Sequence, residues 1–173
     1  QDLPFPVILT GPRSAEAYLQ QLHEFVGATL GHAAQRHYRI VIDDPAEVAK
    51  QMAQGLKEVK QFRRERNDAF HFNWMLKIDE SFQRPFEPTH ENMASLQLSR
   101  SLPPHELAAN LRRAFSGIVA GNVKDNGIRM IEQYGPYEIH GDPAVMLPLD
   151  RLLQAFVKQH RMKLPGGAAY VPC

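Results

Sequence analysis

The sequence predicts an α/β protein in which a strand–helix–strand–helix unit of a parallel sheet comes first and a small helix-rich α+β domain follows. Residues 5–10 (FPVILT) and 38–42 (YRIVI) are continuous apolar runs without alternation, the pattern of strands that a parallel sheet covers on both faces. Helical periodicity follows each run. Near residue 67 the period changes, which indicates a boundary between a domain part over residues 1–66 and a second domain over 67–173.

The first part alternates strands with helices. Ser14 is expected to cap a helix over residues 15–30, whose apolar positions keep helical spacing. After the second strand, Asp44 as N-cap and Glu47 three positions later form a capping box, with a proline at the first helical position. The helix that they begin is expected to continue to about residue 66, with apolar and basic side chains on opposite faces.

Two buried parallel strands do not make a stable sheet alone, because both their edges and both their faces need partners. Almost nothing precedes Gln1 to supply them. We therefore expect the chain to be the C-terminal portion of a larger enzyme, and the apolar surfaces of both strands to be covered by other protein in the native assembly.

The second part is predicted to be helix-rich. Residues 70–78 alternate apolar and polar side chains, as a strand covered on one face does. Thr89 is expected to cap a short helix, and Asp142 the last one, which runs to about Met162. The other expected elements are helices over residues 106–120 and 125–133 and a short strand over 137–140. The side chains expected to face inward on the first of these helices are those of Leu107, Leu111, Phe115, Ile118 and Val119.

Composition excludes several classes of function. The formal net charge is +1, so no overall charge attracts nucleic acid or an anionic membrane. Cys173 is the only cysteine, which excludes an internal disulfide and a thiolate zinc site. The apolar runs are too short to span a bilayer and no export signal is recognisable, so the expected location is the cytoplasm.

Thr10 and Arg13 lie where the first strand is expected to end and a helix to begin. Ligands of open α/β sheets bind at such strand ends, close to helix N-termini. Thr10 could line a pocket there and Arg13 could reach a phosphate group. The alternative is an ordinary βα turn with a solvated arginine.

Lys57, Lys60, Arg63 and Arg64 form a basic cluster on the long helix. Guanidinium and ammonium groups on one helix face suit polyphosphate groups. The alternative is a solvated helix face that Glu58 and Glu65 partly neutralise.

A third candidate is the polar first turn of the short helix at Thr89. Capping accounts for Thr89 and Glu91, but His90 and Asn92 are not needed for it, and exposed N–H groups at a helix start favour an anion. A metal site assembled from His71, His90, His140 and Asp142 is not expected, since only two of these are close in sequence. No carboxylate pair has a spacing that we can connect with acid–base catalysis, so no catalytic residue and no cofactor are predicted.

Several strings resemble a known family. The first part resembles the last βαβα unit of the LOG-like nucleotide-hydrolase fold, which implies that it closes a Rossmann-like parallel sheet. The second part resembles the C-terminal domain of bacterial pyrimidine/purine nucleotide 5′-monophosphate nucleosidases. The strings that carry this likeness are residues 70–74 (FHFNW), 86–93 (FEPTHENM), 109–125 (ANLRRAFSGIVAGNVKD), 161–165 (RMKLP) and 169–173 (AYVPC).

The resemblance implies an oligomeric enzyme that cleaves nucleoside 5′-monophosphates into a free base and ribose 5-phosphate. It also implies regulation by guanosine tetra- or pentaphosphate, (p)ppGpp, for which the basic cluster would be the effector site. The residues that would contact the nucleotide substrate are Thr10, Arg13, His90 and Asn92. The family's catalytic Pro-Gly-Gly-x-Gly-Thr loop is absent: residues 165–169 (PGGAA) lack its last Gly-Thr. Catalysis is thus expected to need residues outside this chain, and the rival reading is a non-catalytic module for effector binding or oligomerisation.

Overall fold

The structure is a computed structural model, and it describes residues 5–66 and 84–162. The described chain gathers into two compact units, one of residues 1–20 and 35–85 and the other of residues 21–34 and 86–173. Residues 21–34 belong to the second unit, although the residues before and after them belong to the first. The two units are therefore not two consecutive segments of the chain. The expected boundary near residue 67 lies outside the described residues and stays a prediction, as does the strand expected over 70–78.

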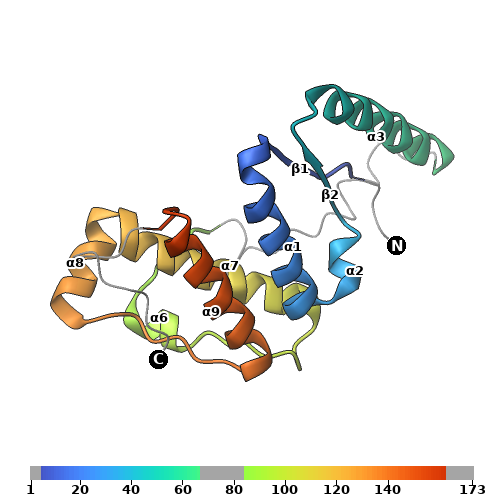
Figure 1. The fold of residues 1–173 in the computed structure, drawn as a ribbon. Helices are drawn as coiled ribbons and strands as arrows, with labels where there is room; N and C mark the ends of the chain where they lie inside the picture. Colours follow the sequence, from blue (N-terminus) through green and yellow to red (C-terminus); the bar gives the residue numbers. More distant parts are fainter. Residues whose placement is uncertain (1–4, 67–83, 163–173) are drawn as a thin grey trace. The chain divides into compact units, whose positions relative to one another are not determined.

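Along residues 5–66 the order of the elements is strand, helix, strand, helix, as expected of an α/β protein. Strands β1 (Ile8–Gly11) and β2 (Arg39–Ile42) pair in parallel, with Ile8 opposite Arg39 and Gly11 opposite Ile42. Between them come a 3-10 helix, η1 (Arg13–Ala15), and helices α1 (Glu16–Leu30) and α2 (His32–Gln35). After β2 the chain enters the long helix α3 (Pro45–Glu65) (Figure 1).

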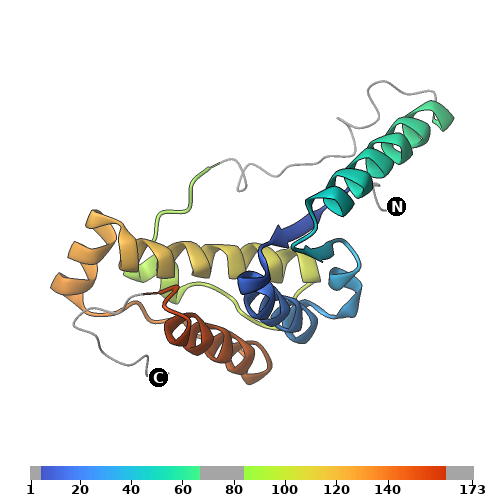
Figure 2. The same ribbon diagram turned by 45° about the horizontal axis from the view of Figure 1, so that its top comes forward.

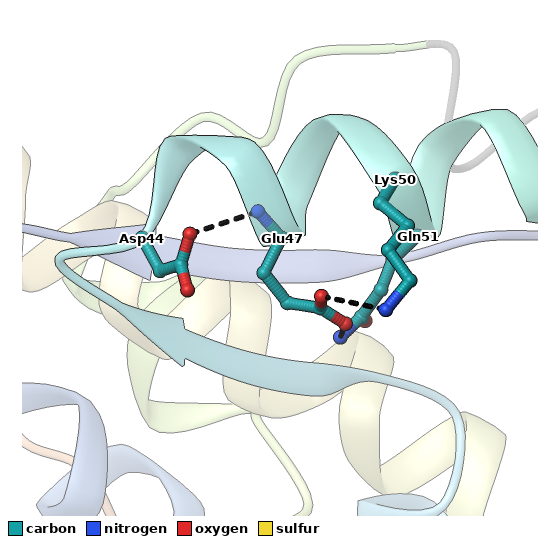
Figure 3. Close-up of polar contacts among 4 residues, drawn as sticks. All are labelled: Asp44, Glu47, Lys50 and Gln51. Atoms are coloured by element: carbon teal, nitrogen blue, oxygen red, sulfur yellow. Dashed lines mark hydrogen bonds and ion pairs between the residues drawn. The ribbon is translucent and has the colours of Figure 1, made fainter.

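The start of α3 is built as its sequence indicates, with one difference. The carboxylate of Asp44 accepts a hydrogen bond from the backbone N–H of Glu47 at 2.9 Å, and Pro45 takes the first helical position. The carboxylate of Glu47 does not complete the capping box. It accepts hydrogen bonds from the side chains of Gln51 and Lys50 instead (Figure 3).

The sheet of the first unit is incompletely covered by the residues described. Side chains of both strands are half-buried or exposed, although the apolar runs predict strands buried on both faces. Gly55, the buried residue of α3, contacts Pro6 so closely that a Cβ would lie 2.5 Å from the proline ring. Met52 and Leu56, on the expected apolar stripe of α3, remain exposed.

The second unit is a helical cluster around one apolar core. Its elements are α6 (His90–Ala94), α7 (Pro104–Val123), α8 (Asp125–Tyr134) and α9 (Pro143–Lys158). Figure 2 shows α7, in yellow, along the length of this unit, with α9, in red, beside it. The core joins Met93 and Leu98 to side chains of α7 and α9, and Phe25 packs edge-on against Phe115 at 5.8 Å between ring centroids.

Small residues let α8 approach α7 closely. A Cβ on Gly127 would collide with the carbonyl of Ala120 and the backbone nitrogen of Gly121. A Cβ on Gly117 would likewise collide with the side chain of Met93. At Gly127 the obstacle is backbone, so the space there admits glycine alone, whereas at Gly117 it is the end of a flexible methionine side chain.

Four local expectations are wrong. Ser14 lies inside η1, which continues directly into α1, so it does not cap a helix from outside. Val119 is 50% exposed, so its side chain does not face the core as helical spacing had indicated. The other two concern where elements lie along the chain. Residues 137–140 form no strand, and next to them only Gly141 forms a single bridge, with Leu98. Helix α9 ends at Lys158, before the expected Met162.

Candidate functional site

The carboxyl ends of β1 and β2 meet at one edge of the sheet. Thr10 is an exposed residue of β1 there, and the backbone N–H of Asp43 donates to the carbonyl of Gly11 at 2.9 Å. Arg13 follows on η1, with its Nε 3.9 Å from the Asp43 carboxylate. The structure therefore brings Thr10 and Arg13 to the end of the strand, as predicted.

Asp43 is a residue of this edge that the sequence reasoning missed. Its φ of 55° lies in the left-handed region, which aspartate tolerates better than most residues. Such backbone conformations cluster at functional sites. The available signal was the Asp-Asp pair at positions 43 and 44, because only one of the two can cap α3 and the other must have a different role.

The ion pair between Arg13 and Asp43 leaves the guanidinium available to a ligand. Both side chains are largely exposed, at 79% and 56%. An exposed pair of this kind contributes about 0–1 kcal/mol. Asp43 therefore holds the Arg13 guanidinium only weakly.

The turn at Thr89 has a different character, because its polar side chains have partners within the second unit. Thr89 Oγ1 accepts from the N–H of Asn92 at 3.1 Å, which confirms the predicted cap, and Asn92 Nδ2 donates to the carbonyl of Glu87 at 2.9 Å. His90 Nε2 lies 2.9 Å from the carbonyl of Gly135. These bonds give His90 and Asn92 a role in the fold, and their contact with a nucleotide stays a prediction.

Aromatic contacts reinforce the position of His90. Its ring lies against Tyr134 and Tyr137, at 5.9 and 4.8 Å between centroids. Burial raises the pKa of Tyr137, whose hydroxyl is buried and has no hydrogen-bond partner among the described residues. Thr10 and Arg13 belong to the other unit.

The basic cluster lies on the last turns of α3. Lys57, Lys60, Arg63 and Arg64 are all exposed. The nearby carboxylates of Glu58 and Glu65 accept hydrogen bonds from Gln54 and Gln61 at 3.0 and 2.8 Å. Arg66 stacks over the ring of Phe62 at 3.5 Å. Four exposed cationic side chains thus share this end of the helix with two carboxylates, and arginines in a last turn also suit the helix dipole.

Other polar groups have local roles. Asp142 precedes α9 without a side-chain cap bond, and its carboxylate accepts from Ser99 Oγ and from the N–H of Arg100, at 2.5 and 3.1 Å. Within residues 5–66 and 84–162, no three histidine, cysteine or acidic side chains are arranged to hold a metal ion, and His71 lies outside these ranges. No helix in the described part of the chain is long and apolar enough to cross a membrane.

Comparison with known proteins gives a consistent result. Residues 56–173 match the family model described as pyrimidine/purine nucleotide monophosphate nucleosidase, C-terminal. All 173 residues align at 58% identity with the pyrimidine/purine nucleotide 5′-monophosphate nucleosidase of Escherichia coli strain K12, and equally with those of E. coli O6:H1 and O157:H7. The chain spans 38% of the length of each of these relatives.

Proposed function

Because the chain belongs to the pyrimidine/purine nucleotide monophosphate nucleosidase family, as a C-terminal region of it, we propose that it is part of an enzyme that hydrolyses nucleoside 5′-monophosphates. The observation that carries the proposal is 58% identity over all 173 residues to relatives of that name. In the reaction water adds to C1′ of the ribose, the bond from C1′ to the base nitrogen breaks, and free base and ribose 5-phosphate leave.

Hydrolysis of the glycosidic bond needs both substrate-binding and catalytic groups, and we propose that this chain provides only the former. The transition state has oxocarbenium character at the ribose, so a carboxylate that orients the water and stabilises positive charge is needed. We assign that carboxylate to the remainder of the protein, and no catalytic residue to this chain. A LOG-like, Rossmann-like sheet, of which β1 and β2 would be part, places a nucleotide at the carboxyl ends of its strands.

Thr10 and Arg13 are the substrate contacts that the geometry favours. Both lie at the strand end, where, among the described residues, the exposed carboxylate of Asp43, 3.9 Å from Arg13 Nε, would compete with a phosphate. His90 and Asn92 are weaker candidates, because each has a hydrogen-bond partner in its own unit.

The basic cluster of α3 is the proposed site for (p)ppGpp. Its support is the exposure of Lys57, Lys60, Arg63 and Arg64 and the suitability of such groups for phosphates. An effector held there would bridge α3 and whatever packs beside it, and so could shift one part of the protein relative to another. We further propose that the enzyme is a cytoplasmic homo-oligomer, without nucleic-acid or membrane partners.

The second candidate function is a module for effector binding or oligomerisation with no share in catalysis. The observation that favours it is the engagement of His90 and Asn92 in holding the turn at Thr89. Substitution of Thr10, Arg13, His90 and Asn92 one at a time in the full-length protein separates the two functions.

A fall in kcat/KM at saturating effector supports a share in the active site. Unchanged kinetics with an altered effector response supports the module. The isolated chain is expected to release no free base from AMP or a pyrimidine monophosphate above a buffer blank.

A further inference from the structure

Asp43 follows the second strand directly, and its backbone is fixed there. Its N–H donates to the carbonyl of Gly11 at 2.9 Å, so the hydrogen bonding between the strands continues one residue beyond β2. With a φ of 55°, it then leads the chain from β2 toward α3. Glycine, asparagine and aspartate are among the residues that adopt this conformation most readily, and of these three aspartate alone carries a charge.

The fold does not account for that charge. The neighbouring Asp44 is the cap of α3, since its carboxylate accepts from the N–H of Glu47 at 2.9 Å. Within residues 5–66 and 84–162 the carboxylate of Asp43 accepts no hydrogen bond, and its ion pair with Arg13 spans 3.9 Å between exposed side chains. An exposed pair of this kind contributes little to stability. The oxygens of Asp43 are therefore acceptors that a ligand at the strand end could use.

Arg13 and Asp43 offer complementary groups next to each other. Arg13 approaches the carboxylate through Nε, the inner nitrogen of its guanidinium. The two outer nitrogens provide an edge that suits two oxygens of a phosphate. A sugar 5-phosphate presents a phosphate and ring hydroxyl groups a few bonds apart, so one small ligand could engage both side chains.

The order of the elements indicates which hydroxyl group is concerned. In nucleotide-binding parallel sheets the phosphate lies at the helix start after one strand, and an acidic residue after the next strand accepts a hydrogen bond from the ribose 2′-hydroxyl. Along this chain β1 is followed by the turn with Arg13, and β2 by Asp43. Residues 11–16 (GPRSAE) lack the Gly-rich turn of dinucleotide-binding sheets, so here the phosphate contact would come from the arginine.

We propose that Asp43 determines specificity for ribose. Its carboxylate accepts a hydrogen bond from the 2′-hydroxyl of the nucleotide whose phosphate pairs with Arg13. A 2′-deoxyribose has no donor at that position, so the ribonucleotide binds more tightly. The inference rests on the proposed function, which places the nucleotide at this end of the strands.

The experiment is calorimetric titration of the full-length protein with ribose 5-phosphate and, separately, with 2-deoxyribose 5-phosphate. Neither sugar has a glycosidic bond to hydrolyse, so binding is measured without turnover. Wild type should bind ribose 5-phosphate about tenfold more tightly, because the deoxy sugar lacks one hydrogen bond to a charged group. The ratio of the two Kd values is the readout, since any change in the phosphate contact affects both sugars alike.

Two substitutions of Asp43 test the proposal. Asp43→Gly removes the acceptor and suits the φ of 55°, so the ratio of Kd values should fall close to one. Asp43→Asn keeps the shape of the side chain and removes the charge, and the ratio should fall several-fold. The same ratio in wild type and Asp43→Gly would overturn the proposal. So would a wild type that does not distinguish the two sugars or that binds neither.

Two further variants are controls. Arg13→Ala should weaken both sugars and leave their ratio unchanged, because both carry the phosphate. Asp44→Asn removes the same charge one residue away and keeps a side chain that caps helices, so it should bind as wild type does. Release of free base from nucleoside monophosphates is measured separately. Its absence in wild type would contradict the proposed function alone, while the ratio of Kd values still decides the role of Asp43.

Discussion

Replacing Arg63 and Arg64 together by alanine should weaken (p)ppGpp binding about a hundredfold. Both side chains are exposed in the last turn of α3 and are close to the face that carries Lys57 and Lys60. A hydrogen bond to a charged group contributes about 1.5–3 kcal/mol, and exposure to water favours the lower end of that range. Two such contacts amount to about 3 kcal/mol, which corresponds to roughly a hundredfold in Kd.

The assay is calorimetric titration of the effector into the full-length wild type and the double variant. Turnover measured without effector should barely change, because these residues are at the opposite end of α3 from the carboxyl ends of the strands. Arg151→Ala with Lys158→Ala removes the same charge from α9 and should leave the affinity unchanged. Equal (p)ppGpp affinity in wild type and the Arg63/Arg64 variant would refute the reasoning, and Arg112 and Arg113 would be tested next.

Three further predictions concern the fold of the same full-length protein, measured by hydrogen exchange of peptides over the altered element. Asp44→Ala should destabilise the start of α3 by about 1 kcal/mol, since the cap bond is lost; unchanged protection there would contradict this. Gly127→Ala should speed exchange in α7 and α8 about 5–30-fold, for a loss of about 1–2 kcal/mol, because its Cβ meets backbone. Gly121→Ala, whose Cβ would clash with the tip of the Ile131 side chain and not with backbone, should cost less, and the reverse order would contradict the packing. Tyr137→Phe should be neutral or stabilising, as the hydroxyl is buried without a partner among the described residues, whereas a loss above about 1 kcal/mol would reveal an unseen partner.

Local signals in the sequence were the ones that predicted structure correctly. Asp44 and Thr89 cap their helices through an N–H three residues later, a distance that the sequence itself defines. The two apolar runs predicted the parallel strands, because short continuous apolar runs rich in β-branched residues are typical of strands in a parallel sheet. Thr10 and Arg13 became candidates for the same reason. The residues that end a strand can be recognised in the sequence, and ligands of parallel sheets bind at the carboxyl ends of strands.

Long-range contacts could not be read in this way. His90 lies 45 residues from the carbonyl that it contacts, and nothing in its own turn indicates Gly135 as a partner. Asp142 was predicted to cap a helix, yet its carboxylate binds Ser99 and Arg100, more than forty residues earlier. Val119 was placed inward by helical spacing alone, whereas the close approach of α8 at Gly127 shows which side of α7 is covered.

The central claim is that this chain lines the active site of a nucleotide nucleosidase, and product analysis with the full-length protein tests it most directly. Nucleoside 5′-monophosphates are incubated with wild type and with Arg13→Ala, and free base and ribose 5-phosphate are quantified together. We predict equimolar base and ribose 5-phosphate from wild type, with kcat/KM at least tenfold lower for Arg13→Ala through loss of a charged phosphate contact. Absence of base release from wild type would contradict the activity. Equal kcat/KM in the two proteins would contradict the assignment of Arg13, the contact that the geometry favours, to the active site.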